Sequence, residues 1–388
     1  MHNSWRSNRI AFIVLPAIIG LLIVLPGYRF AAAQNPAPDA QPQSSPNSSP
    51  ESSLGATPEQ AAASGRISIN VVVSDKLGHP VPGLQEGDFT LLDNKRPQKL
   101  LGFRAIDNQT LQSNPVHVVI VVDMINAEFD VVAREREELG RFLKEDGGEL
   151  ANPTSLAVFA DGGLKVGNGS TRDGNALLAG LDKTQSELRI IGRGTGFYGA
   201  ADMLQMSISQ LGQLAAYEAT QPGRKMILVI SPGWPLLPWA GDEADMKQRT
   251  WVFNSIVQFT NGLREADIAL YCLDPFDFGR TDPFYYQGYL KGIPAAKNAE
   301  YADLALQVLA EHSGGQVLVT GRDISGELNV AVRDASASYE LTFEAAPGDL
   351  PNEYYALQVQ VDKPNAKVHT TSGYYARAPA EMQLNARY

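Results

Sequence analysis

Apolar residues in the middle of the chain form a run that fits one kind of strand. Val116 to Val122 is almost entirely β-branched, follows Asn114-Pro115 and stops at Asp123. A run that is apolar on both faces is typical of a central strand in a parallel sheet with helices on both sides. We expect its carboxyl end, at Asp123, to lie at the edge where ligands bind in open α/β sheets.

Strand-like and helix-like patterns alternate from this run onward, over residues 116–336. The further strand-like segments are short and apolar: 155–160, 164–166, 225–230, 268–273 and 316–319. Segments with apolar residues at helical spacing lie between or after them: 132–143, 173–181, 201–215, 252–263, 301–309 and 328–335. This alternation predicts an α/β domain with a doubly wound, mostly parallel, Rossmann-like sheet.

Short segments with period-two alternation flank this domain on both sides. Three precede it, at 67–73, 89–92 and 99–103, and three follow it, at 339–343, 355–361 and 368–374. Such segments predict antiparallel strands. Neither group is large enough to bury a core alone. We therefore expect residues 66–115 and 337–377 to pair as one small antiparallel β unit, into which the α/β domain is inserted.

The first residues of the chain have the pattern of an export signal. Arg6 and Arg9 precede residues 10–25, which carry no polar side chain, and Ala31-Ala32-Ala33 follows. This order predicts a signal peptide at 1–33, cleaved after Ala33. The alternative is an uncleaved anchor, although the apolar stretch is shorter than the ~20 residues that a spanning helix needs. Either way we expect an exported protein, periplasmic, on the cell surface or secreted.

Two other segments lack core-forming patterns. Residues 34–65 are rich in Pro, Ser, Ala and Gln and contain little to bury, so we predict a disordered linker. Residues 378–388 form a tail in which no helix or strand is predicted.

The composition and net charge exclude some classes of binding partner. The 388 residues carry 32 basic and 43 acidic side chains, a formal net charge of −11. Without residues 1–33 three arginines are lost, 29 basic side chains remain and the charge becomes −14. Nucleic acids and anionic lipid surfaces are bound through basic patches, so we expect neither as a partner. Contact with a membrane is expected only through an uncleaved amino-terminal segment.

Three stretches resemble a known family. They are Val81-Pro82-Gly83-Leu84 with Asp88-Phe89-Thr90, Val119 to Asp123 with Asn126, and Ser372-Gly373-Tyr374-Tyr375. With them, the chain from about Ile67 to Tyr375 resembles the von Willebrand factor type A-related proteins described as an acidobacterial-type family. The resemblance implies a von Willebrand A domain and a role in protein binding or cell adhesion. It implies no general biochemical activity.

The resemblance also implies a metal-ion-dependent adhesion site, and the sequence departs from its pattern. In type A domains an Asp-x-Ser-x-Ser motif, a threonine and a second aspartate hold Mg²⁺ or Ca²⁺ through oxygen atoms. Here Asp123 is present, but Ile125 and Ala127 occupy the serine positions and Pro232 that of the second aspartate. We therefore expect a degenerate site with no metal ion or other cofactor. If Mg²⁺ or Ca²⁺ binds, the matching ligands are Asp123, Asn126, Thr195 and Ser231.

Catalytic patterns are missing from the sequence. The Gly-rich stretches 167–169 and 192–196 complete neither a dinucleotide nor a P-loop motif, so we interpret them as turns. No histidine lies near a serine or cysteine in a recognisable nucleophile motif, and Cys272, the single cysteine, sits in an apolar run. The spacing of carboxylate pairs such as Asp274 and Asp277 does not distinguish a catalytic acid from a solvated loop. We predict that the protein is not an enzyme, with a hydrolase as the less favoured alternative.

Aromatic residues gather in two connections that follow buried strands. The residues that we predict to bind a partner are Trp234, Trp239, Phe284, Tyr285, Tyr286 and Tyr289. Both connections leave carboxyl ends of strands, so they should lie at the same edge as Asp123. Long loops in compact domains are usually functional, and aromatic side chains dominate interface energetics. We predict that a protein or peptide binds here; the alternative is that these loops pack against the sheet edge or the β unit.

The sequence thus predicts an exported, non-enzymatic binding or adhesion module. The main alternative is an adhesion protein that depends on a divalent metal at Asp123 and Thr195.

Overall fold

A computed structural model describes most of the chain after residue 64. The described residues are 65–106, 108–127, 129–167, 169–185, 197–235, 245–275, 285–319, 321, 323–345, 348, 350 and 352–376. All of these described residues belong to one compact unit. The predicted signal peptide (1–33), all of the predicted linker (34–65) but its last residue, and the tail (378–388) lie outside the described residues. Among the helices that are described, none combines the length and the hydropathy of a membrane span.

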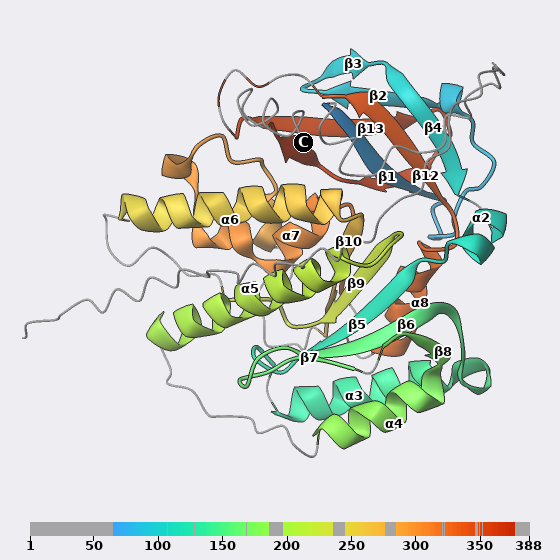
Figure 1. Cartoon of the computed structure of the whole chain (residues 1–388), viewed down its shortest axis with the longest axis vertical. Helices are drawn as coiled ribbons and strands as arrows, with labels where there is room; N and C mark the ends of the chain where they lie inside the picture. The colour runs from blue at the N-terminus through green and yellow to red at the C-terminus, as the bar shows by residue number, and fades with distance from the viewer. Residues whose placement is uncertain are drawn as a thin grey trace, which may run out of the picture. The chain divides into compact units, whose positions relative to one another are not determined.

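A mostly parallel sheet is the centre of the α/β domain, as predicted (Figure 1). Its order is β11-β10-β9-β5-β6-β7, with β8 also paired to β6. The strands β5, β6, β9, β10 and β11 pair in parallel, whereas β7 and β8 run antiparallel to β6. Their bounds are β5 (His117–Asp123), β6 (Glu149–Phe159), β7 (Lys165–Val166), β8 (Thr171–Asp173), β9 (Lys225–Ile230), β10 (Ile268–Asp274) and β11 (Val317–Val319).

Strand β5 is buried because helices cover both faces of the sheet. Val119 and Val121 face one core, which is lined by α5 (Phe197–Ala219), α6 (Met246–Glu265) and α7 (Leu306–His312). Val118, Ile120 and Val122 face the other core. That second core is lined by α3 (Phe129–Lys144), α4 (Gly174–Gln185) and α8 (Ile324–Arg333). The β-branched run therefore packs on both faces, which is the reason for its unbroken apolar pattern.

The β unit consists of two four-stranded antiparallel sheets. One has the order β14-β1-β12-β4 and the other β15-β13-β2-β3. Each sheet contains strands from before and after the α/β domain. The bounds are β1 (Arg66–Ser74), β2 (Phe89–Asp93), β3 (Arg96–Gln98), β4 (Leu100–Ile106), β12 (Ser338–Glu344), β13 (Tyr354–Val361), β14 (Lys367–Thr370) and β15 (Gly373–Tyr375).

A shared apolar core holds these two sheets together. Phe89 and Tyr339 lie in it with ring centroids 5.0 Å apart. The hydroxyl of Tyr339 donates to the carbonyl of Val81 at 2.6 Å and accepts from the amide of Leu84 at 3.1 Å. These bonds fix the Val81–Leu84 connection, so that stretch has a structural role.

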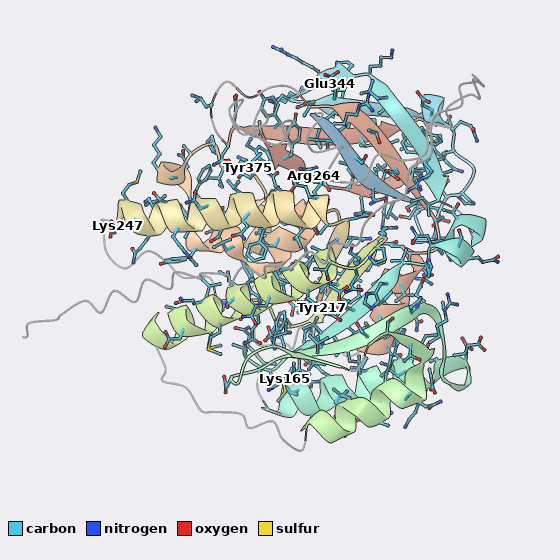
Figure 2. All side chains as sticks on the ribbon, in the orientation of Figure 1. Lys165, Tyr217, Lys247, Arg264, Glu344 and Tyr375 are labelled. Carbon is cyan, nitrogen blue, oxygen red and sulfur yellow. The ribbon has the colours of Figure 1, made fainter. Side chains whose placement is uncertain are left out.

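Side chains connect the α/β domain to the strands of the β unit. Asn261 of α6 forms two bonds with the backbone of Tyr375: its Oδ1 accepts from the amide at 3.1 Å and its Nδ2 donates to the carbonyl at 2.9 Å. The Tyr375 ring packs edge-on against Phe253 at 5.8 Å, beside α6 in Figure 2. Short helices complete the described structure: α2 (Asn108–Ser113), η1 (Glu86–Asp88), η2 (Glu145–Gly148), η3 (Tyr285–Tyr289), η4 (Ala296–Asn298) and η5 (Tyr301–Leu304).

Candidate functional site

Asp123 lies at the carboxyl end of β5 and is completely buried. Its Oδ1 accepts the backbone amides of Ile125 at 3.0 Å and Asn126 at 3.2 Å. Its Oδ2 accepts Nδ2 of Asn126 at 2.8 Å and the hydroxyl of Ser231 at 2.7 Å. Burial raises the pKa of Asp123, and the hydrogen bonds from Ser231 and Asn126 oppose this shift. Both carboxylate oxygens are thus filled by donors from the protein.

Two of the side chains that could join Asp123 as metal ligands are also engaged elsewhere. The Ser231 hydroxyl accepts the backbone amide of Gly233 at 3.1 Å. The Asn126 amide donates a second bond, to Oγ of Ser207 on α5, at 2.8 Å. These contacts join the segments after β5 and β9 to α5. Thr195, the fourth candidate ligand, lies outside the described residues.

The described residues do not fit a hard divalent cation at Asp123. Mg²⁺ and Ca²⁺ need several oxygen lone pairs directed at one point. Here the lone pairs of Asp123 point at N–H and O–H groups, and Ile125, in a motif serine position, is buried in the apolar core. Over the described residues, no group of three His, Cys, Asp or Glu side chains is placed to hold a metal.

Glu135 is a further buried carboxyl group, and the sequence patterns did not single it out. It projects from α3, and neither of its carboxyl oxygens has a hydrogen-bond partner in the described structure. Burial raises the pKa of Glu135 well above its usual value, and the nearby Asp123 and Asp274 raise it further. This shift favours the neutral form of Glu135, which is a poor cation ligand. Asp277, paired with Asp274 in the sequence, lies outside the described residues.

Trp234 is not an exposed anchor, which corrects the prediction made for it. Its side chain is only 2% exposed and lies in the core lined by α5, α6 and α7. The preceding Gly233 has φ +87° and lies against Gln307 of α7, where a Cβ atom would collide with the Gln307 side chain. The chain therefore turns down into the core immediately after β9. For Trp234, packing against the sheet edge is the correct interpretation.

The aromatic residues of η3 differ in their exposure to solvent. Tyr286 is 4% exposed and packs against Ala305 and Val308, so it too is a core residue rather than an exposed anchor. Tyr285 and Tyr289 are half-buried at the edge of the same cluster. Trp239 and Phe284 lie outside the described residues. Of the six predicted anchors, Tyr285 and Tyr289 are the two that the structure describes as accessible to a partner.

The structure brings one histidine close to a serine, a contact that no sequence motif indicated. The Nε2 atom of His117 lies 3.1 Å from Oγ of Ser155, and its Nδ1 atom lies 3.0 Å from Oε2 of Glu218. These contacts have the order and distances of a catalytic triad. Ser155 is only 3% exposed, however, and lies within β6 at the amino end of the sheet. We interpret the arrangement as a polar link between β5, β6 and the end of α5.

Several polar residues that shape this domain lie on otherwise apolar helix faces. Gln210 of α5 accepts from the amide of Ala160 at 3.0 Å and donates to its carbonyl at 2.8 Å, holding the end of β6. Ser207 and Glu218 lie on the same face of α5 and are completely buried. The signal that could have identified them is their spacing, because they interrupt the apolar positions that predict the helix.

No protein-family model matches this sequence, and no curated protein matches it. Among solved structures, the VWA domain of SpRpn10 is 16% identical with a TM-score of 0.26, over 53% of this chain and 86% of that one. The N-terminal domain of TFIIH p34 is 14% identical with a TM-score of 0.21, over 42% and 82%. The pilus adhesin SpaC from Lactobacillus rhamnosus GG is 10% identical with a TM-score of 0.32, over 74% and 48%. These scores are low, so the functional argument rests on the chain's own residues.

Proposed function

We propose that this protein is an exported, non-enzymatic module that binds a protein or peptide without a bridging cation. In this proposal its von Willebrand A-like domain is inserted in the β unit. The observation that carries the proposal is the state of Asp123, whose two carboxylate oxygens accept four hydrogen bonds from the protein itself. A metal-dependent adhesion site would need those same lone pairs.

The role that follows for Asp123 is structural. Its hydrogen bonds link the segments after β5 and β9, and Asn126 extends the link to Ser207 of α5. Buried hydrogen-bond networks of this kind rigidify the elements that they join, although Oδ1 of Asn126 has no partner among the described residues. Rigid connections at the carboxyl edge of the sheet are suited to presenting side chains to a partner.

Tyr285 and Tyr289 are the side chains that we propose for contact with the partner. Both are half-buried on η3, where Tyr286 anchors the segment by packing on Val308 of α7. A tyrosine offers an apolar ring and a hydroxyl at little entropic cost, which is why the residue is enriched at interfaces.

The burial of Ser155, which contacts His117 in a triad-like arrangement, supports a protein without enzymatic activity. A nucleophile must reach the reacting atom of its substrate at about 3 Å. Ser155 is buried between neighbouring strands, so its hydroxyl is not accessible to a substrate.

Photo-crosslinking tests the proposal directly. With a benzophenone amino acid at Tyr289, we expect the full chain to crosslink a protein from the envelope fraction of the producing cells, equally with Mg²⁺ or with EDTA. The Tyr285→Ala change should reduce the yield at least fivefold. Tyr217 on α5 is the matched control, because it is 48% exposed and lies outside η3; Tyr217→Ala should leave the yield unchanged.

Two outcomes would count against the proposal. A crosslink that appears only with Mg²⁺ or Ca²⁺ would favour the metal-dependent adhesion protein. The loss of all crosslinks at Tyr289, while other surface positions capture a partner, would show that η3 is not the binding surface.

A further inference from the structure

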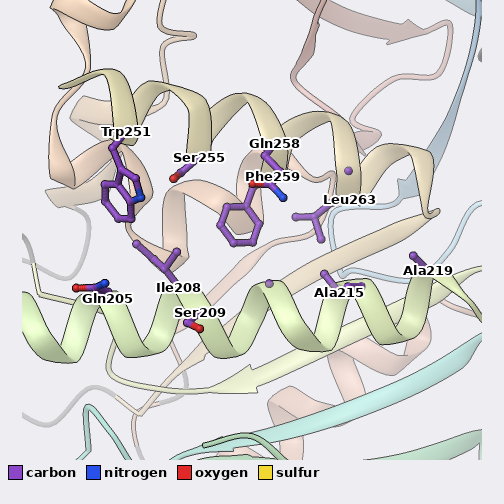
Figure 3. Close-up of a pocket in the computed structure, with 13 residues that line it drawn as sticks. Gln205, Ile208, Ser209, Ala215, Ala219, Trp251, Ser255, Gln258, Phe259 and Leu263 are labelled. Carbon is purple, nitrogen blue, oxygen red and sulfur yellow. The ribbon is translucent and has the colours of Figure 1, made fainter. Parts of the chain in front are cut away.

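Helices α5 and α6 leave a groove between them on the surface of the α/β domain (Figure 3). Its volume is about 460 Å³, and its floor includes Ile208 and Phe259. Trp251 and Gln205 lie at one end and Leu263 and Ala219 at the other. Because Gly212 and Gly262 are among its lining residues, side chains do not fill the space between the two helices there.

The chemistry of this groove suits an extended peptide. None of its lining residues is charged. The floor is apolar, whereas the lining residues Gln205, Ser255 and Gln258 on the two helices bring amide and hydroxyl groups to it. A peptide segment brings backbone N–H and C=O groups that need partners when water is removed. Amide and hydroxyl side chains above an apolar floor can supply those partners.

The chain itself provides a segment close to the groove. The backbone of Tyr375 is held by Asn261 of α6, the residue before Gly262 in the groove lining. Ala376 is the last residue described, and residues 377–388 follow it in the sequence. The described chain therefore ends beside the helix that forms one wall of the groove, near its Leu263 end.

The sequence after this point has a short alternating pattern. Apolar residues Met382, Leu384, Ala386 and Tyr388 alternate with Gln383, Asn385 and Arg387. Seven residues are too few to predict a core element, and no strand was expected there. In an extended segment, alternate side chains lie on one face, so all four apolar residues would face the same surface.

We propose that residues 382–388 bind in the α5–α6 groove as an extended segment, with Tyr388 beside Trp251. The lengths agree. The groove runs from Leu263 to Trp251, which at 1.5 Å per residue is roughly 18 Å along α6. The six steps from Met382 to Tyr388 span about 20 Å when extended, and the six steps from Ala376 to Met382, through the five residues 377–381, span about 20 Å as well. Those five are long enough to cross a helix roughly 10–12 Å wide.

Disulfide trapping in the full chain tests this placement. Ser255→Cys provides one thiol in the groove, and Asn385→Cys, Ala386→Cys or Arg387→Cys provides the other. The native Cys272 is buried and stays in place in every variant. We expect an intrachain disulfide to form at least fivefold faster with Ala386→Cys than with Asn385→Cys or Arg387→Cys. In the proposed placement, residue 386 is on the face of the segment that points into the groove, and residues 385 and 387 are on the opposite face.

Each other outcome overturns the placement. Equal rates at the three positions would mean a tail without a fixed face, and no disulfide would mean that the tail lies elsewhere. Disulfides between chains would mean that the groove binds a second copy.

Deletion of residues 377–388 gives an independent readout that does not depend on cysteine geometry. Trp251 is 42% exposed in the described structure, and a bound Tyr388 would cover it further. We expect acrylamide quenching of tryptophan emission to increase about twofold on deletion. The increase should vanish in a Trp251→Phe background; if it persists there, the tail does not cover Trp251.

Discussion

Replacing Trp234 with alanine is expected to lower the free energy of unfolding by about 3–5 kcal/mol, the range observed for truncating a large buried aromatic residue. Trp234 is 2% exposed and packs in the core lined by α5, α6 and α7. Its removal leaves a cavity between the sheet and these helices that the fixed turn at Gly233 cannot close. Chemical denaturation followed by circular dichroism measures the change.

Two variants make this result specific. Trp234→Phe should cost about 1–2 kcal/mol, because it keeps an aromatic ring and the indole N–H has no hydrogen-bond partner among the described residues. Tyr217→Ala, at an aromatic residue of α5 that is 48% exposed, should change the stability by less than about 1 kcal/mol. If Trp234→Ala is as mild as Tyr217→Ala, Trp234 is not a core residue and returns as a candidate for contact with a partner.

Replacing Asp123 with alanine is expected to cost about 3 kcal/mol or more. The change leaves the amides of Ile125 and Asn126 and the hydroxyl of Ser231 without their acceptor in a buried place. Each buried donor that loses its partner costs roughly 1–3 kcal/mol. The measurement is again chemical denaturation, in buffer that contains EDTA.

The controls separate burial from local turn geometry. Asp123→Asn keeps one acceptor oxygen and should cost about half as much. Asp75 accepts the amides of Leu77 at 2.8 Å and His79 at 2.9 Å in a similar local turn, but it is exposed. Asp75→Ala should therefore cost much less stability than Asp123→Ala. An Asp123→Ala loss as small as that of Asp75→Ala would contradict the structural role of Asp123.

The parts of the fold that could be predicted from the sequence are those with long local patterns. The β-branched run that became β5 is apolar on both faces, and only a central strand of a covered sheet satisfies that pattern. Strand β6 was predicted from residue 155 but begins at Glu149, because its first residues include polar Asn152 and Pro153 and lack the apolar signal. The short strands β3 and β8 were missed for the same reason.

The burial of Trp234 could not be predicted because a local pattern does not define the path of a connection. A Trp between Gly and Pro residues has the composition of an exposed loop. Its burial depends on where Gly233 meets Gln307 of α7, which is distant in the sequence.

The contact of His117 with Ser155 and Glu218 was missed for a related reason. Ser155 and Glu218 are 38 and 101 residues away from His117 in the sequence. They meet only because β5 and β6 are adjacent and in register, with Val119 opposite Ser155, and because α5 ends above them. Sequence spacing carries no information about such contacts.

The sequence was enough to predict that the metal site is degenerate. Only the structure shows which hydrogen bonds Asp123 makes instead. Ile125 and Ala127 in the serine positions indicated a lost site. They did not indicate that Asn126 and Ser231 would turn toward Asp123 and fill Oδ2 with two hydrogen bonds. Such side-chain directions depend on the loop conformation, which the sequence pattern alone does not define.

The central claim is that no divalent cation binds at Asp123, at the carboxyl edge of the sheet. Calorimetric titration of the full chain with MgCl₂, CaCl₂ and MnCl₂ tests it most directly, with the melting temperature followed in parallel. We expect no saturable heat and no change in melting temperature up to 10 mM of each ion. A site with a Kd of about 0.1 mM would instead stabilise the protein by about 2.7 kcal/mol at that concentration. Saturable binding of Mg²⁺ or Ca²⁺ that disappears in Asp123→Asn would contradict the account.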